Sequence, residues 1–261
     1  MSSGNVKETV IQFGEGGFLR GFVDYFFHKL REKGLYDGKI VVVQPIEKGM
    51  CQILADQNCE YNLFLRGIDN GQVVNEHTHV TSISRALNPY TQYEEYIALA
   101  ENPDLRVLVS NTTEAGIEYL GTEKLTDMPP KSYPAKLCQF LYKRYKAGLK
   151  GLIFLPCELI DANGENLKKC VLQYADLWEL EDGFKNWIEE ENDFCSTLVD
   201  RIVTGYPRDE VEELTKKIGY EDKLIDTAEI FHLWVIGGHH EDELPFQKAG
   251  YNIVWTDDVH P

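Results

Sequence analysis

The stretch VIQFGEGGFLRGF, residues 10–22, determines the expected fold. Three glycines (Gly14, Gly16 and Gly17) separate a β-branched apolar run from a helix-forming segment, and Arg20 follows three residues after the last of them. Glycine costs backbone entropy, so a cluster between two regular elements needs a structural reason. We interpret the cluster as a turn whose backbone lies against a bulky anionic ligand. A plain tight turn is the alternative.

The context of the glycines is a strand followed by a helix. Residues 8–13 predict a buried strand, and apolar residues recur with helical spacing from Leu19 to Leu30, in a helix expected to end at Gly34. Gly14 is expected to make the sharp turn. Gly16 and Gly17 are expected to let the backbone approach a dinucleotide pyrophosphate at the helix N-terminus. The match to G-x-G-x-x-G departs at its sixth position, which is Leu19.

The remaining pattern predicts an α/β fold. Strands are expected at 39–45, 105–112 and 151–156, a hairpin around Asp69-Asn70-Gly71 within 61–83, and helices at 91–102 and 134–147. This alternation indicates a doubly wound, mostly parallel, Rossmann-like sheet with the hairpin as an insertion. Beyond residue 164 the pattern turns helical (165–180, 184–191, and Pro207 to Gly219), with late strands at 231–236 and 251–255. We expect a core of 8–160 and a helical extension of 161–261.

The end of the second strand bears on the choice of cofactor. Gln44 stands where an acidic residue would select NAD by binding its ribose. An amide can still hydrogen-bond a ribose hydroxyl, and Glu47 lies nearby. Lys48 either meets a 2′-phosphate or is simply solvated. The sequence therefore favours NAD over its phosphorylated form.

Polar residues that follow other strands are further candidates. Asn111 and Thr112 end a parallel strand, where they either face the cofactor or make the turn. Glu114 and Glu158 lie on two such loops and either relay protons or cap helices. Arg20 either contacts the cofactor phosphates or is an exposed helix residue. The pairs His77/His79 and His239/His240 lack an evident third ligand, so we expect solvated loops and no metal.

Composition excludes several classes of partner. The chain of 261 residues has a formal net charge of −17, so its field repels nucleic acid and anionic membranes. No apolar run reaches membrane-spanning length, and no signal segment is evident at the N-terminus. Six cysteines are scattered without a CxxC pair, which predicts reduced thiols and a cytoplasmic protein.

Four stretches together resemble the mannitol dehydrogenase family, also called the long-chain polyol dehydrogenases, and within it the sugar-acid branch. They are QFGEGGFLRGF (12–22), VLVSNTTEAGI (107–117), LPCELIDANGENL (155–167) and FCSTLVDRIV (194–203). The resemblance implies NAD-dependent hydride transfer between a sugar-acid ketone and its alcohol. It also implies a cofactor loop formed by Ile11, Gln12, Phe13, Gly14, Glu15, Gly16, Gly17, Phe18, Leu19, Arg20 and Gly21, with Gln44, Asn111 and Thr112 beside it.

The resemblance covers only the cofactor half of such an enzyme. The family's general acid/base lysine, within Lys-x4-Asn-x2-His, is expected beyond Pro261, in a helical substrate domain that this chain lacks. Many relatives polarise the reacting oxygen with an asparagine where this chain has Leu159, which leaves Asn163 as a substitute. Glu158, Asp200 and Arg201 are the other expected contributors. Asp200 and Arg201 form either a buried ion pair or a contact to the substrate carboxylate through Arg201.

Two alternatives remain open at this point. One is another polyol or sugar-acid substrate, since an anionic substrate is not steered toward a chain of charge −17. The other is a non-catalytic nucleotide-binding module that senses NAD or docks a partner.

Overall fold

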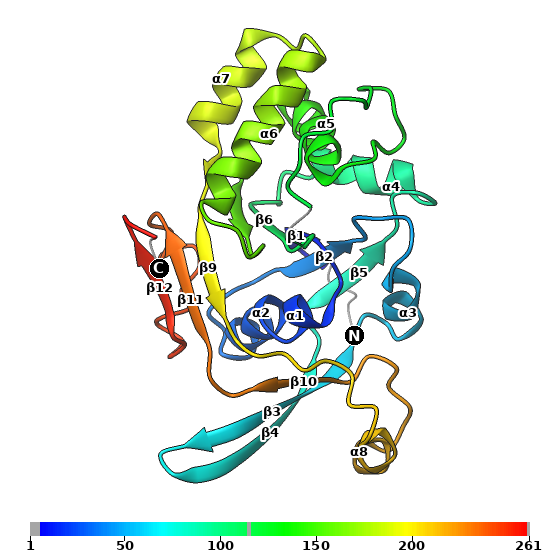
Figure 1. The fold of residues 1–261 in the computed structure, drawn as a ribbon, viewed down its shortest axis with the longest axis vertical. Coiled ribbons are helices and arrows are strands. Elements are labelled where there is room, and N and C mark those ends of the chain that lie inside the picture. Colours follow the sequence, from blue (N-terminus) through cyan, green and yellow to red (C-terminus); the bar gives the residue numbers. More distant parts are fainter. Residues whose placement is uncertain (1–5, 114–115, 260–261) are drawn as a thin grey trace.

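A six-stranded sheet forms the centre of the computed structural model, which describes residues 6–113 and 116–259 (Figure 1). Its strand order is β5-β2-β1-β6-β7-β8, and every neighbouring pair is parallel. The order reverses between β1 and β6, so the carboxyl ends of these strands flank the crevice where open α/β sheets bind ligands. The predicted doubly wound sheet is confirmed. The strands are β1 (Glu8–Phe13), β2 (Lys39–Val43), β5 (Ile83–Leu87), β6 (Val107–Ser110), β7 (Ile153–Pro156) and β8 (Asp193–Phe194).

Helices cover both faces of this sheet. Successive residues of a strand point to opposite faces, so Val10 joins one apolar cluster and Ile11 the other. α2 (Val23–Glu32) packs on the first face, and the helices labelled α4 to α7 lie on the second (Figure 1). Burial on both sides explains the uniformly apolar β2. The helices of the second face are α4 (Tyr93–Ala98), η1 (Leu99–Glu101), α5 (Tyr133–Lys146), α6 (Asn163–Leu177) and α7 (Asp182–Glu191).

The predicted hairpin is confirmed and extends away from the main sheet (Figure 1). β3 (Tyr61–Asp69) and β4 (Gln72–Val80) pair antiparallel around Asn70 and Gly71. Both turn residues have positive φ, 49° and 78°, as a tight two-residue hairpin turn requires. β10 (Asp226–Glu229) adds to β3 in parallel, which gives a second sheet of order β10-β3-β4.

The chain after residue 160 is less helical than predicted. It contains α6, α7 and α8 (Val211–Ile218), but also β8, β10 and a third sheet of order β12-β11-β9. β11 (Leu233–Gly237) and β12 (Ile253–Thr256) match the expected late strands, whereas β9 (Thr197–Asp200) and β10 were missed. β9 and β10 have four residues each and β10 reads DTAE, so neither has a strand pattern of its own. α8 begins after the expected Pro207 and ends at Ile218, next to the expected Gly219, whose φ is +92°.

The helix expected after the glycines is broken into two. α1 (Gly17–Arg20) ends at Gly21, and α2 begins after Phe22, whose φ and ψ are −130° and −89°. A side chain at Gly21 would stand 3.0 Å from Asp226 Oδ2 and 3.3 Å from Val203 Cγ1. The break therefore lets the backbone pack closely against β10. A further short helix, α3 (Cys51–Asp56), was also missed.

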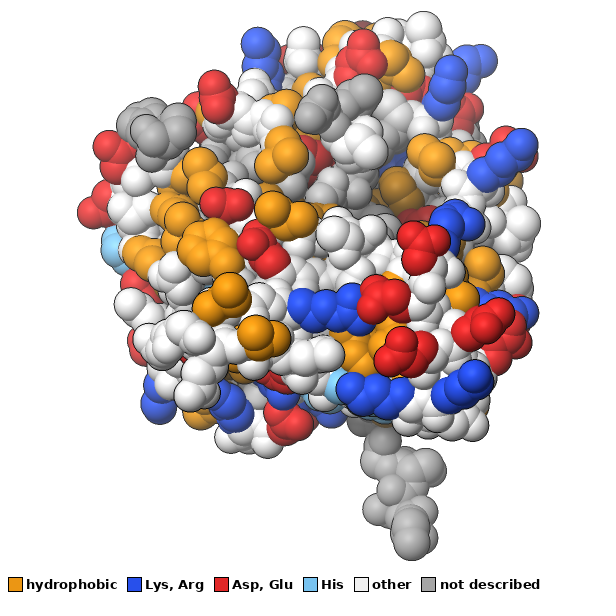
Figure 2. All heavy atoms as spheres, turned by 60° about the horizontal axis from the view of Figure 1, so that its bottom comes forward, with side chains coloured by type: hydrophobic (Ala, Val, Ile, Leu, Met, Phe, Trp, Pro, Cys, Tyr) orange, Lys and Arg blue, Asp and Glu red, His pale blue; other side chains and the backbone are white. Residues whose placement is uncertain are grey.

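Apolar side chains are exposed around the end of the hairpin. Ile68 and Val73 face each other across it and are 72% and 86% exposed. Phe231, which follows β10, is half exposed. Figure 2 shows the molecule with the bottom of Figure 1 turned toward the viewer. On this face apolar side chains gather on one side, with acidic and basic groups between them. None of the helices in the described part of the chain has the length and apolarity needed to cross a bilayer.

Candidate cofactor site

The glycine turn lies at the carboxyl end of β1, beside the point where the strand order reverses. Gly14 has a φ of +126°, and a side chain there would stand 2.7 Å from the carbonyl oxygen of Asn111. Only glycine fits this position, so the predicted sharp turn at Gly14 is confirmed. Gly16 has nothing within 4 Å of its missing side chain, which leaves open space at the start of α1.

Gly17 has a different role from Gly16. A side chain at Gly17 would stand 3.3 Å from Asp226 Oδ1, so this glycine permits close packing against β10. The residues before the turn are also structural. Ile11, Gln12 and Phe13 have no exposed surface, and the Gln12 amide donates to Gly14 O and to Asp24 Oδ2. Of the expected cofactor loop, Gly16 is the residue that offers open backbone.

Arg20 does not match either sequence-based expectation. It is 4% exposed, and its guanidinium donates to the carbonyl oxygens of Glu15 and Leu224. Its charge lies 5.3 Å from the ring centroid of Tyr61, whose hydroxyl donates to Arg20 O. Arg20 therefore ties the turn to the segment before β10, and Leu19 beside it is part of the core. Phe18 is half-buried and stacks on Phe22.

Two buried carboxylates lie beneath the turn and were not singled out from the sequence. Asp24 is fully buried, and burial raises its pKa to about 7. Asp226 is also fully buried, and burial raises its pKa to about 6. One oxygen of each carboxylate, Asp24 Oδ1 and Asp226 Oδ2, has no hydrogen-bond partner. Arg20 lowers both pKa values but does not offset the loss of water around either group.

Glu15 and Gln44 hold the loop at 45–50 against the turn. The Gln44 amide donates to the carbonyl oxygens of Ile46 and Glu47 and accepts from Cys51 N. Glu15 Oε1 accepts from Met50 N at 3.0 Å, and burial raises the pKa of this carboxyl. A Gln44 amide occupied in this way is not free for the ribose hydroxyl expected from the sequence. Instead it shapes the loop that carries the exposed Glu47 and Lys48.

The hydrogen bond from Met50 N to Glu15, which helps to hold the loop at 45–50 against the turn, supports a prediction for Glu15. Glu15→Ala removes the acceptor for Met50 N and is expected to weaken NADH binding about fivefold, since one hydrogen bond is worth about 1 kcal/mol. Glu15→Gln keeps an acceptor oxygen and serves as the matched control with near-normal affinity. Fluorescence titration of NADH measures both. An unchanged dissociation constant for Glu15→Ala would show that the hydrogen bond between Met50 and Glu15 does not position the loop for NADH.

Glu158 joins the ends of β6 and β7. It is 2% exposed and accepts hydrogen bonds from Ser110 Oγ, Thr112 N and Thr112 Oγ1, at 3.0–3.1 Å. Burial raises the pKa of its carboxyl. It caps no helix, and it fixes Thr112 beside Asn111 at the crevice. Glu114 lies outside the described residues.

Asn163 is unsuitable as an oxyanion donor. It is fully buried, and its amide nitrogen donates to the carbonyl oxygens of Pro156, Glu158 and Thr197. Its oxygen accepts from Thr197 N. The expectation that Asn163 substitutes at the position of Leu159 is therefore wrong, because every donor and acceptor of the amide is already paired.

Asp200 and Arg201 do not form the predicted buried pair. Asp200 is exposed and Arg201 is 6% exposed, because neighbouring residues at the end of β9 point to opposite sides. Arg201 donates to the carbonyl oxygens of Gly21, Ile230 and Phe231. Burial lowers its pKa to about 10. A guanidinium fixed among these groups is not available to a substrate carboxylate.

A cavity of about 980 Å³ adjoins this edge of the sheet. It is lined by the loop from Glu158 to Ala162, by β8 and β9, and by the segments that follow β11 and β12. Leu159 is 68% exposed there. Among the described lining residues there is neither lysine nor arginine, and seven carry carboxylates: Glu158, Asp161, Glu165, Asp193, Asp200, Asp257 and Asp258.

Residues 8–247 match the mannitol dehydrogenase Rossmann domain. The chain belongs to the mannitol dehydrogenase family. The altronate oxidoreductases of Phocaeicola vulgatus and Bacillus subtilis are 50% and 46% identical to it over 260 residues, which is 97% of this chain and 54% of theirs. The chain thus spans about half the length of the curated relatives it matches.

Solved structures of sugar and polyol dehydrogenases share the fold. Mannitol 2-dehydrogenase of Pseudomonas fluorescens, in a ternary complex with NAD and D-mannitol, superimposes with a TM-score of 0.82 at 22% identity. It matches 98% of this chain and 54% of its own. A D-sorbitol dehydrogenase in substrate-free form gives a TM-score of 0.80 at 23% identity, over 97% of this chain and 55% of its own.

Proposed function

We propose that this chain is the cofactor-binding half of an NAD-dependent oxidoreductase that interconverts tagaturonate and altronate in hexuronate catabolism. The observation that carries the proposal is the open backbone at Gly16, on a turn that Gly14 alone can make, at the reversal point of the sheet. The names of the relatives at 46–50% identity support the substrate class, and a neighbour bound to NAD supports the cofactor.

When bound, NADH would supply the hydride in the reducing direction and NAD⁺ would accept it in the other, while this chain supplies binding and orientation. The first backbone N–H groups of α1 would face the pyrophosphate. The loop held by Glu15 and Gln44 would lie beside the adenine ribose, and the Asn111 and Thr112 segment, held by Glu158, would lie on the other side of the cofactor. The proton donor and the cations that meet a sugar-acid carboxylate come from the other half of the enzyme. Six buried, free cysteines are consistent with a cytoplasmic location.

A substrate panel tests the sugar-acid assignment. The full-length protein is expected to reduce tagaturonate with NADH at a much higher kcat/KM than fructuronate or fructose, the ketone partner of mannitol. Equal activity on fructose and mannitol would contradict the assignment of a sugar-acid substrate. The assignment as an oxidoreductase would still hold. The alternative hypothesis, a non-catalytic nucleotide-binding module, predicts a stop codon in the gene before any Lys-x4-Asn-x2-His motif.

Gly16→Ala separates cofactor binding from folding. The backbone of Gly16, at φ −68° and ψ 167°, suits alanine, and nothing lies within 4 Å of the new methyl group. We expect an unchanged melting temperature with NADH binding weakened at least tenfold, because the methyl group occupies the space of the pyrophosphate. Gly34→Ala, at an open position whose φ of +67° disfavours alanine, is expected to lower the melting temperature but to leave NADH binding unchanged. Normal NADH affinity in Gly16→Ala would place the cofactor elsewhere.

The expected choice between NADH and NADPH follows from the side chains at the end of β2. Gln44 is neutral, and Lys48 is a single cation. We expect NADH to be preferred over NADPH by at least about tenfold, or ~1.4 kcal/mol. Steady-state kinetics of the full-length protein with both cofactors measures the ratio. A preference for NADPH would show that Lys48, or a cation from the other half, binds the 2′-phosphate.

A further inference from the structure

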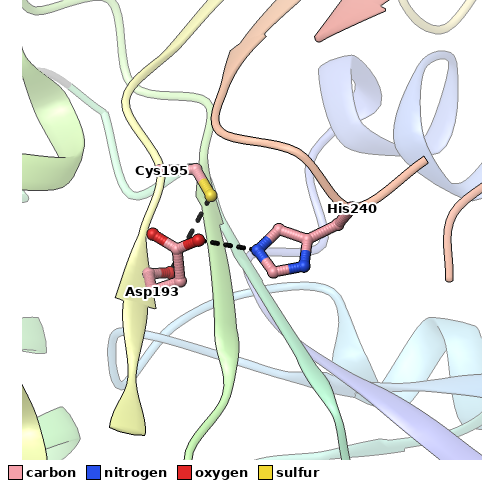
Figure 3. A group of neighbouring side chains, drawn as sticks. All are labelled: Asp193, Cys195 and His240. Carbon is pink, nitrogen blue, oxygen red and sulfur yellow. Dashed lines mark hydrogen bonds and ion pairs between the residues drawn. The ribbon is translucent and has the colours of Figure 1, made fainter. Parts of the chain in front are cut away.

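Asp193, Cys195 and His240 bring a carboxylate, a thiol and an imidazole together beside the cavity (Figure 3). Their ligand atoms all lie within 4.8 Å of one another, and His240 Nε2 is 2.6 Å from Asp193 Oδ2. Asp193 begins β8, Cys195 follows that strand, and His240 lies on the loop after β11. We propose that these three side chains bind one Zn²⁺-like ion, with its fourth position open to the cavity.

The donor set suits zinc in kind and in number. Thiolate sulfur, imidazole nitrogen and carboxylate oxygen are its usual ligands, and sites with three protein ligands keep the fourth position for water. Tetrahedral zinc, with bonds of about 2.0–2.3 Å, holds its donor atoms about 3.4–3.6 Å apart. The Asp193 and His240 atoms, now 2.6 Å apart, therefore separate by less than about 1 Å. Cys195 Sγ, within 4.8 Å of both, approaches them by at most about 1.3 Å. Small side-chain rotations are sufficient for both movements.

A glycine keeps the space beside these donors open. Gly238 has a φ of +103°, and a side chain there would stand 3.5 Å from Asp193 Oδ2 and 3.6 Å from Cys195 Sγ. Gly238 also lines the cavity, together with Asp193 and Cys195. The free space therefore lies where an ion and its water would need it.

The imidazole is oriented from behind, as metal-bound histidines usually are. The ring of His240 packs edge-on against Trp255, with centroids 5.6 Å apart. Its Nδ1 lies 3.6 Å from Glu243 Oε1. Glu243 is itself held by two hydrogen bonds from Arg106, at 2.7 and 2.9 Å. At 3.6 Å this is an electrostatic contact and not a hydrogen bond, and it favours the ring orientation in which Nε2 faces Asp193.

Metal binding at this site requires the release of a proton. Zinc binds sulfur as the thiolate. When the sulfur of Cys195 bonds to the ion, its S–H bond therefore breaks and the proton passes to solvent.

The sequence could not identify this set. Its members come from segments about 45 residues apart, and no ligand spacing connects them. His239 and His240 were expected to be solvated together, but only His239 is: its side chain is 58% exposed, against 17% for His240. His239 therefore serves as a control for His240 in a metal-binding experiment, because it contacts Glu241 and Asp257 instead of Asp193 and Cys195.

Cobalt binding tests the site independently of NAD and of catalysis. Tag-free, chelator-treated chain is titrated with Co²⁺ and then with Zn²⁺. We expect one Co²⁺ per chain, a thiolate-to-cobalt charge-transfer band, its loss on Zn²⁺ addition, and one proton released. Cys195→Ser is expected to abolish the band, and His240→Ala to weaken binding at least about 100-fold, beyond the 10- to 100-fold typical of a residue behind the ligand. Glu243→Gln is expected to fall in that 10- to 100-fold range.

His239→Ala and Cys170→Ser are the matched controls and are expected to bind like the unsubstituted chain. Circular dichroism melts establish that each variant is folded. If His240→Ala does not fold, the cobalt titration of Cys195→Ser tests the proposal. The proposal is overturned if no charge-transfer band forms, if the band survives in Cys195→Ser, or if His239→Ala weakens binding as much as His240→Ala does.

Discussion

The 261-residue chain alone is expected to reduce tagaturonate at least about 100-fold, and up to about 10,000-fold, more slowly than the full-length protein. A positioned general acid or base contributes this range to a rate. The expected lysine lies beyond Pro261. Among the described residues, Arg20 and Arg201 are fixed by backbone carbonyls and Asn163 by its own hydrogen bonds. The described cavity lining offers carboxylates and no lysine or arginine to an anionic substrate.

The measurement compares NADH oxidation by the chain and by the full-length protein at the same concentration, with NADH binding followed on both. Weak but measurable NADH binding, with turnover at least about 100-fold below that of the full-length protein, is the expected result for the chain. Turnover within about tenfold of the full-length rate would mean that the proton donor lies within residues 1–261. The first group to test would then be the buried Glu158.

Local sequence patterns predicted the parts of the fold that local chemistry determines. Gly14 occupies a backbone conformation closed to other residues, and Asn70-Gly71 makes the hairpin turn, so both were visible in the sequence. β10 was not visible, because its four residues, three of them polar, become a strand only by pairing with β3. The break at Gly21 depends on the same contact, since Asp226 stands where a side chain would be.

The candidate site was predicted less well than the fold, because the sequence left open whether its charged side chains face a ligand or other parts of the protein. Arg20 binds Leu224 O, 204 residues away, and Arg201 binds Gly21 O, 180 residues away. Gln44 folds back onto its own loop. A sequence shows that such residues are unusual, but not which distant carbonyl they meet. The alternative left open for Arg20, Gln44 and Arg201, that they contact a ligand directly, is not supported by these hydrogen bonds.

Asp24→Asn is expected to raise the free energy of unfolding by about 4 kcal/mol at pH 8 relative to pH 4. Burial raises the pKa of Asp24 from 3.8 to about 7 in the folded chain. The folded state therefore keeps a proton that the unfolded state loses between these values, and stability falls as pH rises through them. About three pKa units at ~1.36 kcal/mol each give the estimate. Asparagine carries no charge at any pH, and Gln12, whose Oε1 is unpaired, can accept from its amide.

The quantity to measure is the difference in unfolding free energy between Asp24→Asn and the unsubstituted chain, from urea denaturation at intervals from pH 4 to pH 8. Taking the difference cancels the carboxylates whose pKa values salt bridges lower, such as Glu243, since these contribute equally to both proteins. Glu213→Gln, at an exposed position on α8, is the control and is expected to give a flat difference. Asp226→Asn should show a smaller rise, of about 3 kcal/mol, with a lower midpoint, because the pKa of Asp226 is about 6. A flat difference for Asp24→Asn would mean that Asp24 is ionised in the folded chain at low pH. Arg20 would then stabilise the charge beneath the glycine turn more strongly than burial opposes it.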